Sequence, residues 1–177
     1  MFGYIKNILK RKSLKDAAVR VGKRNKATYN FETAKVMGVI YPFNINMASV
    51  AGALKDISER YDIELVFMVY FPQEKLPEGI AENTPSQIFF SDNECNWFGK
   101  PKVAAINSFV NTKFNILVDL SSKEWFPLQY IAVASHADFK IGRMNGETNN
   151  PYDFVLAGNV NDEQFIKVLE TYLYKIK

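Results

Sequence analysis

The fold is decided by residues 36–71, which read VMGVIYPFNINMASVAGALKDISERYDIELVFMVYF. This stretch begins with a continuous apolar run, Val36–Tyr41, that is typical of a strand buried on both faces. Apolar residues then recur at steps of three and four from Met47 to Tyr61, which marks one face of a helix. A second apolar run follows at Ile63–Phe71. A strand, a helix and a strand at this spacing predict a right-handed crossover between parallel strands.

The rest of the chain continues this alternation. We predict further strands and helices at Ser86–Ser91 (strand), 103–110 (helix), Phe114–Leu120 (strand), Trp125–Ala137 (helix), Phe139–Ile141 (strand), Tyr152–Ala157 (strand) and Asp162–Ile176 (helix). Strands that alternate with helices indicate a parallel sheet covered on both faces. We therefore expect an α/β fold with three layers, Rossmann-like, with an open and mostly parallel sheet of about six strands in the order 3-2-1-4-5-6.

Length and composition suit a cytoplasmic protein with one main domain. The chain has 177 residues, enough for one domain and an appendage. Its single cysteine, Cys95, cannot form an internal disulfide or a zinc cluster, so nothing points to an oxidising compartment. The first residues are charged every few positions, unlike a secretory signal. No run approaches the roughly 18 to 20 apolar residues that cross a bilayer.

The charge of the chain is unevenly distributed. Residues 1–26 carry nine basic side chains and one acidic one, a net charge of +8, whereas the remaining residues sum to −5. We therefore divide the chain into a basic helical arm, residues 1–30, and a single α/β domain, residues 31–177. One interpretation is that residues 1–26 bind an acidic partner protein, nucleic acid or an anionic membrane surface. The alternative is a solvated helix, or an arm that folds back on its own acidic body.

The arm itself is expected to contain two short helices. The apolar face of its first residues does not continue into the apolar face after Leu14, so one straight amphipathic helix fits the pattern poorly. Ser13 and Asp16 have the spacing of a capping box, which predicts that the helix restarts there. Gly22 is a plausible stop signal for the second helix.

A ligand site, if the fold has one, is expected at the carboxyl ends of the strands, where the strand order reverses. The candidate ligand-binding residues at this edge are Asn44, Asn46, Lys100, Asp119, Ser121, Ser122 and Arg143. Asp119 ends a predicted strand, and Ser121 and Ser122 precede a helix, whose first amides can hold an anion. The alternative is that one of these serines is the N-cap and that Asp119 hydrogen-bonds its own turn.

Two of these candidates are basic, and a histidine lies near them. Lys100 precedes a helix and could contact a phosphate. Arg143 suits two-pronged phosphate binding, but equally suits pairing with Glu147 or Asp153. His136 is expected to stabilise the carboxyl end of a helix through its charge rather than to act as a base.

The sequence lacks the common catalytic signatures. It has no glycine-rich dinucleotide loop after the first strand, no phosphate-binding P-loop, no hydrolase nucleophile elbow and no cluster of metal-ligand residues. We therefore predict no cofactor and no metal.

The motifs FGKPK (98–102), FNILVDLS (114–121), FPLQYIAVASHADFKIG (126–142) and YDFVL (152–156) resemble an uncharacterised family of Bacteroidetes proteins, a domain of unknown function. The resemblance covers most of the chain, from the arm to the last helix. The resemblance supports the architecture and implies no activity, because none is assigned to the family.

Two functional hypotheses follow. The first is a non-catalytic binding module whose basic arm contacts an acidic partner, nucleic acid or a membrane surface. The second is an enzyme that acts on a phosphorylated small molecule, such as a nucleotide or sugar nucleotide, at the carboxyl edge of the sheet. The fold alone supports neither hypothesis over the other.

Overall fold

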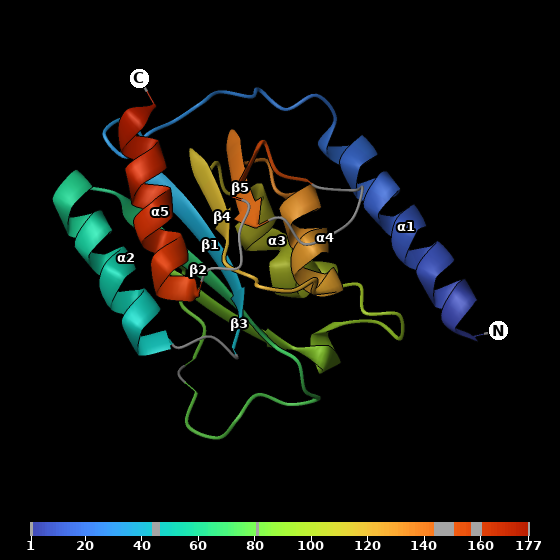
Figure 1. Cartoon of the computed structure of the whole chain (residues 1–177). Coiled ribbons are helices and arrows are strands. Elements are labelled where there is room, and N and C mark those ends of the chain that lie inside the picture. The colour runs from blue at the N-terminus through green and yellow to red at the C-terminus, as the bar shows by residue number, and fades with distance from the viewer. Residues whose placement is uncertain (1, 44–46, 81, 144–150, 157–160, 177) are drawn as a thin grey trace.

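A computed structural model describes residues 2–43, 47–80, 82–143, 151–156 and 161–176. The strands in these residues are β1 (Val36–Pro42), β2 (Glu64–Phe71), β3 (Gln87–Ser91), β4 (Ile116–Asp119), β5 (Phe139–Arg143) and β6 (Phe154–Leu156). They form one sheet in the order β3-β2-β1-β4-β5-β6, and each neighbouring pair is parallel (Figure 1). The predicted α/β class and strand order 3-2-1-4-5-6 are therefore confirmed.

Helices cover both faces of this sheet. They are α1 (Phe2–Val21), α2 (Met47–Tyr61), α3 (Val103–Asn111), α4 (Phe126–Ala134) and α5 (Asp162–Lys175), with a short 3₁₀ turn, η1 (Asp92–Glu94). Figure 1 shows α2 and α5 on one face, α3 and α4 on the other, and α1 outside α4. The core accordingly consists of two apolar clusters, one on each side of the sheet. The expected three layers are present, and α1 is added to them.

The strands alternate their side chains between the two clusters. In β1, Met37 and Val39 face α2 and α5, whereas Ile40 faces α3 and α4. Between them Gly38 leaves room for a ring, because a Cβ at this position would lie 2.9 Å from the ring of Phe114. The continuous apolar run that predicted this strand thus reflects burial on both faces.

The arm contains one helix, and the prediction of two short helices is wrong. The hydroxyl of Ser13 donates to the backbone carbonyl of Lys10, 2.8 Å away, so it stays inside the helix and does not cap a new one. Ser13 and Ala17 are the buried residues of α1, and α1 packs along α4. Small residues at this contact let the helix continue straight across α4. The helix ends as expected at Gly22, which has a φ of +64°.

The chain between α1 and β1 packs on the body. Phe31 and Ala34 are buried in the cluster beneath α2 and α5. The side-chain amide of Asn30 donates to the carbonyl of Ile176 at the end of the last helix, 2.8 Å away. The division into an arm of residues 1–30 and a domain of residues 31–177 remains a prediction.

Candidate functional site

The crevice was predicted at the carboxyl ends of β1 and β4, which are parallel neighbours in the sheet. Asn44 and Asn46 fall outside the described residues. Asp119 ends β4 and is 4% exposed. Its carboxylate accepts a hydrogen bond from the backbone N–H of Ser121, 2.8 Å away, and another from the hydroxyl of Tyr152. Burial raises the pKa of this carboxyl group. Asp119 therefore organises its own turn, as the second interpretation expected.

The two serines lie before the cap position of α4, so the interpretation of one of them as its N-cap is wrong, and their role in ligand binding stays a prediction. Helix α4 begins at Phe126, with Trp125 in the cap position and Pro127 in the first turn. Proline is favoured in the first turn, which explains why the helix starts here and not near Ser122. Ser121 is buried and Ser122 is exposed.

Arg143 lies on the opposite face of the sheet from Asp119. Its guanidinium pairs with Asp162, 2.6 Å away, and stacks over the ring of Phe165. The expected partner Asp153 instead pairs with Arg24 and Lys26, and Glu147 lies outside the described residues. Asp153 lies in the segment before β6, and Arg24 lies in the segment that follows α1. The charge of Arg143 nevertheless opposes the rise that burial causes in the pKa of Asp119.

Lys100 lies on the side of α3 and α4. Its amine is 5.4 Å from the ring centroid of Tyr130, a cation–π contact. The neighbouring Lys102 donates to the carbonyl of Asn93, 2.7 Å away. The predicted candidates therefore divide between the two faces of the sheet: Arg143 packs against α5, whereas Lys100 lies on the side of α3 and α4.

Other reactive groups are also held in structural roles. Burial, with the nearby Asp92 and Glu94, raises the pKa of the Cys95 thiol to about 12, so it is not a reactive thiolate at neutral pH. His136 is exposed and directly follows Ser135, the C-cap residue of α4, so its role at the carboxyl end of this helix stays a prediction. Among the described residues, no group of three or more metal-ligand side chains is found, and no helix is long and apolar enough to cross a membrane.

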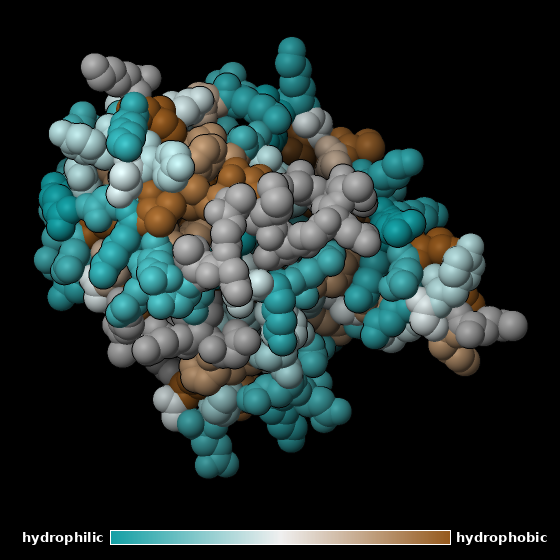
Figure 2. Space-filling view, viewed as in Figure 1, coloured by the Kyte–Doolittle hydropathy of each residue, from teal (hydrophilic) through white to brown (hydrophobic). Residues whose placement is uncertain are grey.

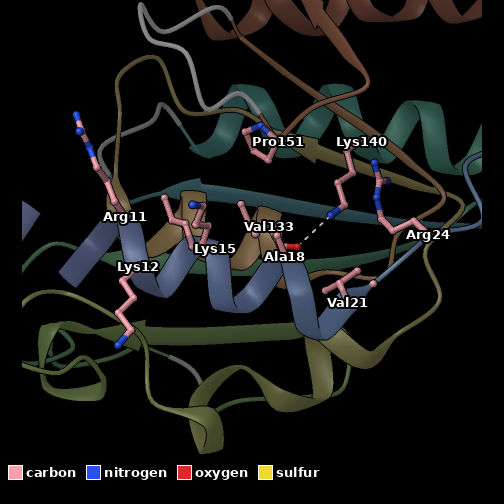
Figure 3. Close-up of a pocket in the computed structure, with 11 residues that line it drawn as sticks. Arg11, Lys12, Lys15, Ala18, Val21, Arg24, Val133, Lys140 and Pro151 are labelled. Carbon is pink, nitrogen blue, oxygen red and sulfur yellow. Dashed lines mark hydrogen bonds between the residues drawn. The ribbon is translucent and has the colours of Figure 1, made fainter. Parts of the chain in front are cut away.

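A basic pocket between α1 and the body was not predicted. It has a volume of about 640 Å³ and lies between α1, the end of α4 and β5 (Figure 3). Five cationic side chains line it: Arg11, Lys12, Lys15, Arg24 and Lys140. No acidic side chain is found among its described lining residues. Four of these cations belong to the basic arm, but no sequence pattern connects them with Lys140.

Lys140 contacts the carboxyl end of α4 from the neighbouring strand. It is 2% exposed, and its amine donates to the backbone carbonyls of Ala132, 2.6 Å away, and Val133, 3.4 Å away. These carbonyls belong to the last turn of α4, which has no basic residue of its own. Lys140 thus satisfies the carboxyl end of α4 from the neighbouring strand. Burial, strengthened by the charge of Arg24, lowers the pKa of Lys140 to about 7.

The free end of α1 carries a second unusual surface. Its apolar side chains Phe2, Tyr4, Ile5 and Ile8 are 84%, 73%, 43% and 47% exposed. Figure 2 shows brown, hydrophobic residues among teal, hydrophilic ones where α1 projects from the body. We call Phe2, Tyr4, Ile5 and Ile8 the apolar tip.

Comparison with known families gives one match. Residues 6–176 match the model of a family of unknown function, DUF6913. The chain belongs to this family. The resemblance to an uncharacterised family, stated from the sequence, is confirmed at this level, and membership assigns no activity. Searches of curated proteins and of solved structures found no match.

Proposed function

We propose that this member of DUF6913 is a non-catalytic binding module that docks on an anionic membrane surface through the amino-terminal half of α1. The observation that carries this proposal is the apolar tip. Phe2 and Tyr4 are more than two-thirds exposed. Leaving them in water is unfavourable, whereas insertion among lipid headgroups removes apolar area from water.

The charges beside the apolar tip suit the same surface. Lys6, Arg11 and Lys12 are exposed and form no salt bridge with any residue that the structure describes. The alternative interpretation, in which the acidic body neutralises the arm, applies to Arg24 and Lys26, which pair with Asp153. It does not apply to the cations near the tip. Such cations contribute about 1 kcal/mol each near an anionic membrane.

A membrane fits these residues better than nucleic acid or an acidic protein does. Nucleic acid binding of this kind depends on phosphate contacts and leaves isoleucine side chains without a role. An interfacial helix combines basic residues with apolar ones that enter the headgroup region. The apolar tip and its neighbouring cations provide both components within the first turns of α1.

Sedimentation with lipid vesicles tests the proposal. We expect the protein to bind vesicles that contain phosphatidylserine, to bind pure phosphatidylcholine vesicles weakly, and to lose affinity with added salt. The variant Lys6→Gln/Arg11→Gln/Lys12→Gln removes three cations and should weaken binding about a hundredfold, from about 3 kcal/mol. The variant Ile5→Gln/Ile8→Gln should weaken binding as well, at unchanged charge.

A matched control separates local charge from net charge. The variant Lys75→Gln/Lys113→Gln/Lys167→Gln removes three exposed cations elsewhere on the body and should bind vesicles as the parent protein does. If both triple variants lose affinity equally, the binding is non-specific and the proposal fails. It fails also if single-stranded DNA binds more tightly than vesicles and Ile5→Gln/Ile8→Gln has no effect.

We place this module in the cytoplasm of a bacterium of the Bacteroidetes group. The single, buried Cys95 supports a reducing compartment, and the sequence motifs support the source. The cytoplasmic leaflet of a membrane carries a negative surface potential, which is the surface that the cations of α1 require.

A further inference from the structure

We infer that the pocket between α1, the end of α4 and β5 binds the phosphomonoester group of a small ligand. This pocket lies beside the carboxyl-terminal half of α1, whereas the apolar tip lies at its other end. The inference therefore does not depend on docking to a membrane. The pocket volume of about 640 Å³ falls within the range of about 300 to 1,000 Å³ that small-molecule sites occupy.

The first argument is uncompensated positive charge. Five basic side chains line the pocket, and its described lining contains no carboxylate. Arg24 has a counter-ion, Asp153, which lies outside this lining. Lys15 is exposed and forms no salt bridge with the residues that the structure describes. A doubly charged anion would supply the missing negative charge.

The second argument is the position of Lys140. A lysine side chain that is 2% exposed normally pairs with a carboxylate, but this amine contacts two neutral carbonyls. An ammonium group has three N–H donors, so one is left beyond these two carbonyls. Figure 3 shows Lys140 beside Arg24, with its amine turned towards the carbonyl of Val133. Burial lowers the pKa of the amine, and of the charges that face it Arg24 and Lys26 lower the pKa further whereas Asp153 raises it.

The third argument concerns the rest of the ligand. Leu14, Val21 and Val133 contribute apolar surface to the same pocket, so the ligand carries an uncharged body beside its phosphate. Arg11 and Lys12 extend outward from the rim in Figure 3. Cations at a rim accelerate the entry of an anion more than they hold it. The chemistry is that of a phosphomonoester, from either a soluble metabolite or a lipid headgroup.

Calorimetric titration of the full chain tests the inference, with glycerol 3-phosphate as the soluble probe and phosphatidic acid vesicles as the lipid probe. Vesicles of phosphatidylserine, a phosphodiester, are the comparison. Binding of glycerol 3-phosphate supports the site with a soluble source. Preference for phosphatidic acid over phosphatidylserine, without soluble binding, supports the site with a lipid source. If neither probe is bound, the inference is overturned.

Variants locate the binding. Ala18 lines the pocket from α1 and is exposed, so Ala18→Glu should fold normally and should abolish binding by placing a carboxylate among the cations. Val19→Glu is the matched control, because Val19 is 78% exposed and does not line the pocket. Lys15→Gln should weaken binding about tenfold. Equal loss in Ala18→Glu and Val19→Glu, or no loss in Ala18→Glu and Lys15→Gln, overturns the assignment.

Discussion

Replacing Lys140 with methionine should change how the stability of the protein depends on pH. The pKa of Lys140 is about 7 in the folded protein and 10.5 without the influence of the fold. Between these values the unfolded chain binds a proton that the folded chain has released. Raising the pH in this window therefore stabilises the folded state, and lowering it towards pH 7 removes that stability.

The magnitude follows from the two pKa values. Between about pH 7 and about pH 9.5, titration of this one group raises the free energy of unfolding by about 3 kcal/mol. Methionine has a similar length and no charge, so the Lys140→Met variant lacks this contribution. It also loses the hydrogen bonds to Ala132 and Val133, which contribute about 1 kcal/mol each at every pH.

Urea unfolding at several pH values in this window measures the effect. The free energy of unfolding of the parent protein, minus that of Lys140→Met, should grow by about 3 kcal/mol as the pH rises to about 9.5. Lys167→Met is the control, because Lys167 is exposed on α5 and should leave the pH dependence unchanged. A difference between parent and Lys140→Met that stays constant with pH would refute the assigned proton release.

Three other predictions concern the core and its thiol. Gly142→Ala should destabilise the protein by about 2 to 3 kcal/mol in thermal unfolding, because its Cβ would lie 2.4 Å from the Tyr152 ring; an unchanged melting temperature would contradict the packing. Tyr152→Phe should lower the free energy of urea unfolding by about 1 to 3 kcal/mol, because it leaves the buried Asp119 carboxylate without the phenol donor; a neutral result would show that this bond contributes no net stability. Cys95 should react with iodoacetamide at neutral pH only after denaturation, as followed by mass spectrometry, because it is buried and its pKa is raised to about 12; rapid labelling of the folded protein would contradict this.

The sheet could be predicted from the sequence because each central strand is buried on both faces. Val36–Tyr41 and Ile63–Phe71 therefore appear as unbroken apolar runs, and the helix between them fixes their parallel direction. The single helix of the arm could not be predicted in this way. Its contact with α4 uses Ser13 and Ala17, and small residues leave no apolar stripe in a sequence.

Within the candidate site, only contacts between residues that are close in the sequence could be predicted. The turn at Asp119 could be predicted because an aspartate carboxylate commonly accepts from the backbone N–H two residues later, here that of Ser121. The partner of Arg143 was not predictable, because the nearer acid Asp153 is taken by Arg24 and Lys26 from the arm. The pocket around Lys140 is lined by residues of α1 and β5, which are far apart in the sequence. No short-range pattern contains that information.

Only part of the charge of α1 takes part in its packing on the body. The buried contacts of α1 are Ser13 and Ala17, and its polar anchor is the guanidinium of Arg20, which donates to the hydroxyl of Tyr130, 2.7 Å away. The remaining cations of the helix oppose one another: burial, followed by the charge of Lys6, lowers the pKa of Lys10. Like charges gathered on one helix reduce its stability. Apart from Arg20 and Lys10, which contact Tyr130 and Phe126, the cations of α1 have no packing role among the described residues, and an anionic ligand or surface would reduce their repulsion.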